Sequence, residues 1–93
     1  MNQAKQSRIE FETWEYILPA IEEIAKVSAK GFAKYGAENW ARVETKDNIN
    51  QALRHICLYR DKMEGVPLPE VEENENHLAH ACARLMMEIA KNR

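Results

Sequence analysis

Residues that break helices are scarce in this sequence, which has only three glycines and three prolines among 93 residues. So few glycines exclude a glycine-rich phosphate-binding loop. The G-x-S-x-G motif of hydrolases with a nucleophilic serine is also absent. No hydrophobic run approaches the roughly 18 residues needed to cross a membrane, and the polar N-terminus has no secretory signal. We therefore expect a mostly helical, cytoplasmic protein that does not bind membranes.

The sequence also lacks an excess of basic charge. Its 13 basic and 15 acidic residues give a net charge of −2 at neutral pH. Binding to a nucleic-acid duplex through its phosphates requires a net basic surface, so we expect no such partner. A local site for a smaller anion remains compatible with this balance.

Cysteine is rare as well, with only Cys57 and Cys82 present and no C-x-x-C motif. Both fall on apolar stripes of expected helices, so we predict that they are small buried core residues in a reducing compartment. A disulfide between them is the less favoured alternative.

A chain of this length forms one domain, residues 1–93, and residues 1–8 are expected to be a flexible polar arm. Its core is small, and Phe11, Trp14 and Met87 are apolar residues beyond those that belong to one apolar stripe. We therefore expect a homo-oligomer, in the first place a dimer, because self-association would bury additional apolar surface.

Hydrophobic spacing of three and four residues predicts an all-α fold, a small antiparallel bundle of three main helices with a short N-terminal helical segment at residues 9–14. The main helices are expected at about 17–35, 46–64 and 75–91. Their apolar stripes, which we expect to form the core, include Ile21, Ile24, Phe32, Ile49, Ala52, Leu53, Ile56, Leu78, Ala81, Leu85 and Ile89.

Several residues mark the expected helix ends. Pro19 suits a first helical position, and Gly36 suits the residue after a helix end, as does Gly65. Side chains that accept hydrogen bonds from free backbone N–H groups are available before the later helices. These are Thr45 or Asp47 for the second main helix and Asn74 or Asn76 for the third.

A basic stripe runs along the first main helix. Lys26, Lys30 and Lys34 are spaced by four residues, so they stack on one face and repel one another. An anionic partner such as a phosphate chain would relieve that repulsion. The alternative is a solvated helix face on which Glu22 pairs with Lys26.

A polar face is expected where the last two helices meet. His77, His80, Arg84 and Glu88 follow a spacing of three and four residues, and His55 lies on the preceding helix. Two imidazoles on one side of a helix can bind a metal ion or contact a phosphate. Histidines that are hydrogen-bonded within the fold are the alternative.

An acidic loop precedes the last helix. It contains five glutamates without a lysine or arginine among them: Glu64, Glu70, Glu72, Glu73 and Glu75. Carboxylate oxygens are the ligands that Mg²⁺ prefers, often together with a substrate phosphate. The alternative is a solubilising loop whose negative charge favours the start of the next helix.

Three segments carry a family resemblance. They are Gly31-Phe32-Ala33-Lys34-Tyr35-Gly36-Ala37-Glu38-Asn39-Trp40, Ala52-Leu53-Arg54-His55 and His77-Leu78-Ala79-His80-Ala81. Together they resemble, in order and spacing, the motifs of the phage-associated dATP/dGTP diphosphohydrolase N-terminal family, which is MazG-like and all-helical. The resemblance covers roughly residues 17–90.

This resemblance implies a metal-dependent pyrophosphohydrolase of purine nucleoside triphosphates, in the host cytoplasm if the protein is encoded by a phage. It implies substrate contacts at shared motif positions, to which the basic stripe and the last helix add Lys30 and Arg84. The resulting substrate-binding set is Lys30, Lys34, Tyr35, Asn39, Trp40, Arg54, His55 and Arg84. The catalytic and metal-binding set, for Mg²⁺ or Mn²⁺, is Glu70, Glu72, His77 and His80.

The sequence departs from the family pattern at several positions. The acidic loop reads Pro69-Glu70-Val71-Glu72-Glu73 where the family often has Asp before Glu-Ser, and Arg84 replaces a common Asn. The second half of the MazG carboxylate signature is missing after Glu88. Two alternatives therefore stand beside the hydrolase: a binder without a cofactor that sequesters a nucleotide or cyclic-nucleotide signal, and a structural or interaction protein.

We expect the site where residues 34–40 meet the helix carrying Arg54 and His55 and the helix carrying His77 and His80. This grouping would collect positive charge for phosphates and imidazoles for metal binding or proton transfer.

Overall fold

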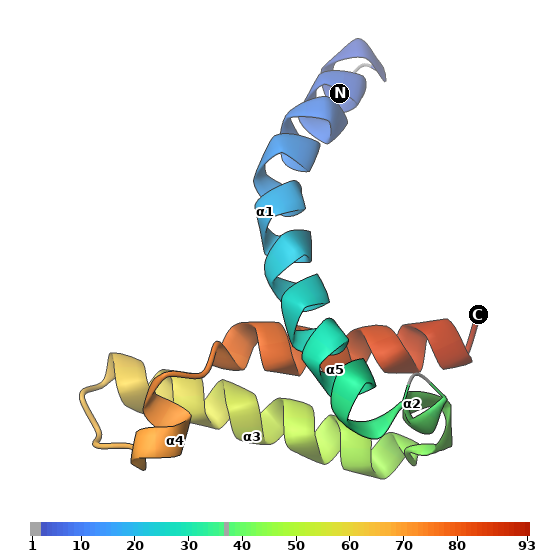
Figure 1. Ribbon diagram of the computed structural model, residues 1–93. Coiled ribbons are helices and arrows are strands. Elements are labelled where there is room, and N and C mark those ends of the chain that lie inside the picture. Colours follow the sequence, from blue (N-terminus) through green and yellow to red (C-terminus); the bar gives the residue numbers. More distant parts are fainter. Residues whose placement is uncertain (1–2, 37) are drawn as a thin grey trace.

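The computed structural model describes the backbone of residues 3–36 and 38–93, and the side chains of residues 14–36 and 38–93 (Figure 1). Within this part of the chain all regular structure is helical, which confirms the expected all-α fold. The helices are α1 (Gln3–Tyr35), α2 (Asn39–Arg42), α3 (Thr45–Met63), α4 (Glu70–Glu73) and α5 (His77–Lys91). None of these helices combines the length and apolar character required to span a membrane.

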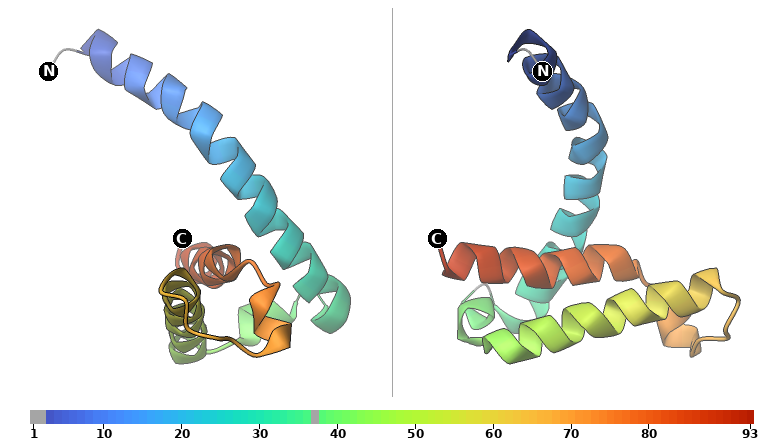
Figure 2. Two further views of the ribbon diagram at one scale, coloured as in Figure 1. Left: turned by 90° about the vertical axis from the view of Figure 1, so that its left-hand side faces the viewer. Right: turned by 180° about the vertical axis from the view of Figure 1, so that it is seen from behind.

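Helices α3 and α5 lie side by side and antiparallel, and they form the centre of the fold (Figures 1 and 2). Glu88 near the end of α5 accepts a hydrogen bond from Thr45 at the start of α3. At the other end of the pair, His77 contacts His55. The C-terminal half of α1 crosses α5, whereas its N-terminal half projects away from the other helices (Figure 2).

Helix α1 is longer than expected. The predicted start at Pro19 is wrong, because α1 runs unbroken from Gln3 through Pro19 to Tyr35. It includes residues 3–8, which were expected to be a flexible arm, and it absorbs the expected separate segment at 9–14. Residues 1–2 lie outside the described residues. Proline inside a helix removes one backbone hydrogen bond and favours bending, and α1 is visibly curved in Figure 1.

The other predicted helix ends have a mixed outcome. Gly36 (φ 84°) and Gly65 (φ 80°) adopt the left-handed conformation after α1 and α3, as predicted. Asn76 caps α5, since its side chain accepts a hydrogen bond from the backbone N–H of Ala79 at 3.1 Å.

The predicted cap of α3 by Thr45 or Asp47 is wrong. Glu44 occupies the N-cap position, and its side chain makes no capping hydrogen bond. Thr45 lies inside the helix, where its hydroxyl donates to a Glu88 carboxylate oxygen at 2.8 Å. The Thr45 side chain therefore makes a tertiary hydrogen bond with Glu88 instead of capping α3.

The core is polar where apolar packing was expected. The buried hydrophobic residues of the described part are four alanines, Ala52, Ala79, Ala81 and Ala83. Beside them lie the buried polar side chains of Asn48, His55, His77 and Glu88. We call this contact between α3 and α5 the polar seam.

The expectation that the apolar stripes of α3 and α5 form the core is confirmed for Ala52 and Ala81 but is wrong for the large aliphatic side chains. Leu53 is 54% exposed and Ile89 is 68% exposed, and other large apolar side chains of both helices are also exposed. Cys57 and Cys82 are exposed and unbonded rather than buried. The reason is that polar side chains of the two helices hydrogen-bond with one another across the helix pair, as Asn48 does with Glu88 and His55 with His77, and the small alanines let the helices approach.

A substitution of Asn48 tests how much the polar seam contributes to the stability of the fold. It is fully buried, donates to Glu88 at 2.5 Å and accepts from Arg84 at 3.2 Å. Asn48→Ala should lower the melting temperature by roughly 10 °C or more, because it leaves buried polar groups short of a partner at a cost of about 2–4 kcal/mol. Thermal unfolding by circular dichroism measures this.

The matched control is Asn50→Ala, an exposed position on the same helix, which should change the melting temperature little. Equal melting temperatures for Asn48→Ala and the unsubstituted protein would contradict a stabilising polar seam.

Candidate functional site

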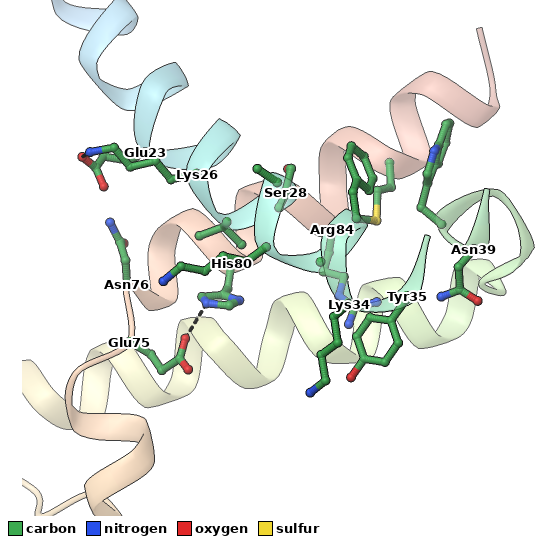
Figure 3. A pocket seen from close by; sticks show the side chains of 18 of the residues that line it. Glu23, Lys26, Ser28, Lys34, Tyr35, Asn39, Glu75, Asn76, His80 and Arg84 are labelled. Carbon is green, nitrogen blue, oxygen red and sulfur yellow. Dashed lines mark hydrogen bonds and ion pairs between the residues drawn. The ribbon is translucent and has the colours of Figure 1, made fainter. Parts of the chain in front are cut away.

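A pocket of about 990 Å³ lies between the C-terminal half of α1, helix α2, the segment before α5 and one side of α5 (Figure 3). It brings together most of the residues predicted to bind substrate. Those that line it are Lys30, Lys34, Tyr35, Asn39, Trp40 and Arg84, and His80 of the predicted catalytic set lines it as well.

The end of α1 shapes one wall of the pocket. Gly36 ends the helix in the left-handed conformation, and its N–H donates to the Phe32 carbonyl at 2.9 Å. The chain then turns into α2, where the backbone N–H of Asn39 donates to the Gly36 carbonyl at 3.2 Å. This tight turn places Tyr35 and Asn39 on the same pocket as Arg84 of α5 (Figure 3).

Positive charge collects on the α1 side of the pocket. Lys26 forms an exposed ion pair with Glu23 at 3.0 Å, whereas the alternative of a solvated face paired it with Glu22. The contact with Glu23 raises the pKa of Lys26. Among the described residues Lys30 and Lys34 are in no ion pair, and the Lys34 ammonium lies 5.1 Å from the centre of the Tyr35 ring. Two lysines are thus available to an anionic ligand.

Arg84 brings further positive charge from the α5 side. One of its guanidinium nitrogens donates to the side-chain oxygen of Asn48 at 3.2 Å, which fixes the side chain against the polar seam. A guanidinium held in this way loses less freedom when it binds a phosphate, and its planar donors suit phosphate oxygens.

His80 and Glu75 form a pair on the pocket wall (Figure 3). The Nε2 atom of His80 lies 2.5 Å from a Glu75 carboxylate oxygen. A carboxylate in this position orients the imidazole and favours the tautomer with hydrogen on Nε2, so that Nδ1 can accept a proton. On its other side the His80 ring stacks on His55, with ring centres 4.7 Å apart.

His55 and His77 are buried behind the pocket. His77 Nε2 lies 2.6 Å from the backbone carbonyl of Glu72, and its Nδ1 lies 2.8 Å from His55 Nδ1. A carbonyl can only accept, so His77 donates from Nε2 and accepts from His55 at Nδ1. Burial, followed by the nearby His80 and His77, lowers the pKa of His55 to about 4. His55 is therefore neutral near pH 7, and both rings serve the fold through hydrogen bonds.

Arg54 lies outside the pocket lining. Its guanidinium pairs with the carboxylate of Glu72 in α4, and the hydrogen bond from Arg54 lowers the pKa of Glu72. Glu70 is exposed at the start of α4. The expected meeting of residues 34–40 with His77 and His80 is thus formed through His80 alone, and the roles predicted for the other residues stay predictions.

The predicted metal ligands do not converge. Within the described residues no group of three or more His, Cys, Asp or Glu side chains is arranged to hold a metal ion. Both ring nitrogens of His77 are engaged in hydrogen bonds, and Glu72 is paired with Arg54. Within the described residues Glu72 and His77 are thus engaged by other partners, and the Mg²⁺ or Mn²⁺ site stays a prediction.

Glu75 is the site residue that sequence reasoning missed. It was noted within the acidic loop, but helical spacing does not connect it with His80 because α5 begins between them. Only the turn at residues 74–76 brings the two side chains together. The one signal in the sequence for this pair is that Glu75 lies shortly before His80, just ahead of the start of α5.

Fold and pocket define a small all-α protein with a basic and aromatic pocket. The family model of the dATP/dGTP diphosphohydrolase N-terminal domain matches residues 2–93. The chain belongs to this family, which confirms the resemblance drawn from its three motifs. Searches of curated proteins and of solved structures gave no significant match.

The burial of His55 predicts a loss of stability in mild acid. In the unfolded chain His55 binds a proton near pH 6.5, but in the folded chain it does so only near pH 4. Its neutral folded form therefore contributes stability that is present above pH 6.5 and is lost as the pH falls. We expect about 2 kcal/mol less stability at pH 5 than at pH 7, measured by urea unfolding.

His55→Gln provides the control for this pH dependence, because glutamine can hydrogen-bond but does not titrate. Its unfolding free energy should change less between pH 7 and pH 5 than that of the unsubstituted protein. The same slope in both proteins would show that His55 is not the titrating group.

Proposed function

We propose that the chain binds a purine deoxynucleoside triphosphate in the pocket between α1, α2 and α5. The observation that carries this proposal is a single pocket lined by four cationic and three aromatic side chains, of which three cations and two aromatic rings would contact the ligand. Lys30, Lys34 and Arg84 supply positive charge, and Tyr35 and Trp40 supply aromatic surface. Phosphates and a base require these two kinds of group.

The dimensions of the pocket support a ligand of this class. Its volume of about 990 Å³ lies at the upper end of the roughly 300–1,000 Å³ that is usual for small-molecule sites. The triphosphate would lie along Lys30 and Lys34 and reach Arg84, while Trp40 would support the base. The choice of dATP or dGTP rests on the family to which the chain belongs.

Lys34→Ala tests the phosphate contacts. Loss of one charge-assisted contact worth about 1.5–3 kcal/mol should weaken dATP or dGTP binding roughly 10- to 100-fold. Isothermal titration calorimetry measures this. Because the cations come from the protein, binding should persist in EDTA.

Lys46→Ala is the matched control, since Lys46 is an exposed lysine beside Glu44 that does not line the pocket. It should leave the affinity unchanged. Equal losses for both variants would indicate diffuse electrostatic attraction, and binding seen only with Mg²⁺ or Mn²⁺ would restore the metal to the proposal.

The second candidate function is hydrolysis of the bound triphosphate, which the family name and the His80–Glu75 pair favour. In this reaction the oxygen of water bonds to the α-phosphorus, and the bond from that phosphorus to its bridging oxygen breaks. The products are the monophosphate and pyrophosphate. His80 Nδ1 would accept the proton from water while Glu75 stabilises the resulting imidazolium. Without this step the protein would sequester a nucleotide, or a cyclic-nucleotide signal.

Pyrophosphate release from dATP and dGTP, measured with Mg²⁺, with Mn²⁺ and in EDTA, tests the second candidate. We expect His80→Gln to abolish release while it changes nucleotide affinity less than about threefold, because it removes the proton acceptor and leaves the cations. No release from the unsubstituted protein under any condition would leave binding as the function.

A further inference from the structure

One ion pair of the pocket wall lies beyond the three cations assigned to the triphosphate. Glu23 and Lys26 of α1 both line the pocket, and a carboxylate oxygen of Glu23 lies 3.0 Å from the Lys26 ammonium (Figure 3). The side chain of Glu23 is 50% exposed and that of Lys26 is 69% exposed, so a ligand in the pocket can reach either of them. Lys26 thus brings to the pocket a positive charge that is already paired.

The basic stripe of Lys26, Lys30 and Lys34 is longer than a triphosphate, and all three lysines line the pocket. An α-helix rises by about 1.5 Å per residue, so neighbouring lysines of the stripe start about 6 Å apart along α1 and the outer two about 12 Å apart. The phosphorus atoms of an extended triphosphate span about one helical turn. A triphosphate can therefore contact two neighbouring lysines, and the third is left for a longer phosphate chain.

The position of Trp40 decides which end of the stripe the terminal phosphate meets. Trp40, which would support the base, follows the C-terminal end of α1, and Lys34 is the lysine of the stripe closest to that end. A phosphate chain that starts there runs back along α1, from Lys34 to Lys30 and then towards Lys26. Lys26 and Glu23 are thus at the end of the pocket where a fourth phosphate would lie.

Glu23 occupies the position that such a phosphate would take. Its carboxylate pairs with Lys26 and places a negative charge at this end of the pocket, where it repels a further phosphate. Lys30 and Lys34, in contrast, are in no ion pair among the described residues. A fourth phosphate would have to displace the carboxylate and then lie beside it, which offsets the contact that it gains with Lys26.

We propose that Glu23 sets the length of the phosphate chain that the pocket prefers. It holds Lys26 as an internal anion, so that a triphosphate fills the free part of the basic stripe and a tetraphosphate gains little over it. This inference rests on the proposed function, because it concerns the same pocket and the same orientation of the ligand. Glu23 determines specificity by withholding Lys26 from the ligand.

Isothermal titration calorimetry in EDTA with dATP and with deoxyadenosine 5′-tetraphosphate tests this role. We expect the unsubstituted protein to bind the two ligands with affinities within about threefold of each other. In Glu23→Gln the tetraphosphate should bind at least about tenfold more tightly than dATP, because Lys26 is then free to contact the added phosphate. Lys26→Ala in the Glu23→Gln background should return this ratio to that of the unsubstituted protein.

Glu22→Gln is the matched control, since Glu22 is an exposed glutamate of the same helical turn that does not line the pocket. It removes the same charge and should keep the ratio of the unsubstituted protein. An unchanged ratio in Glu23→Gln overturns the proposal. An equal rise of the ratio in both variants overturns it as well, because it would show a diffuse effect of charge.

Inorganic tripolyphosphate and tetrapolyphosphate separate this proposal from the proposed function. These chains have no base, so they test the basic stripe even if dATP does not bind. If the ratio of their affinities rises in Glu23→Gln while dATP fails to bind the unsubstituted protein, the nucleotide proposal fails and the role of Glu23 stands for polyphosphates. Absence of binding by all four ligands overturns both proposals.

Discussion

The Glu88 carboxylate determines how the central helix pair is assembled. It accepts hydrogen bonds from Asn48 at 2.5 Å and Thr45 at 2.8 Å, and Lys91 approaches it at 3.0 Å. These bonds lower the pKa of Glu88 to about 2, so that the carboxylate stays ionised over the physiological range. They connect the start of α3 to the end of α5 and thereby set the register of the antiparallel pair. Because the rotation of α5 is set in this way, one of its sides faces the pocket and another carries exposed aliphatic side chains such as Leu85 and Ile89.

A polar seam has consequences for the remainder of the molecule. Buried polar groups contribute little net stability, but they are costly when left without partners, so they select one arrangement of the helices over others. In this chain each buried polar side chain of the seam finds a partner: Asn48 with Glu88 and Arg84, and His55 with His77. The aliphatic side chains are left outside this network. The same feature therefore orders the helix pair and leaves an apolar surface exposed.

The family motifs divide between two roles that their sequences do not distinguish. His77 and His80 belong to one short motif, yet His77 is buried against His55 whereas His80 lines the pocket. Arg54 and His55 are adjacent, but Arg54 is paired with α4 and His55 faces the seam. Two residues that are adjacent or three apart on a helix point in different directions. One of them can therefore be buried between the helices while the other faces the pocket or another helix. Motif membership therefore identifies the family, while orientation in the fold assigns the role.

Local sequence patterns were sufficient to predict the all-α fold, helices α3 and α5, the left-handed glycines Gly36 and Gly65 and the cap at Asn76. These features depend on residues within one or two turns of each other, where spacing and backbone geometry decide. The basic stripe of Lys30 and Lys34 was visible for the same reason. Which side of α3 and α5 faces inward was decided only by the tertiary structure. That choice depends on hydrogen bonds between residues some forty positions apart, such as Asn48 and Glu88, and no local pattern contains them.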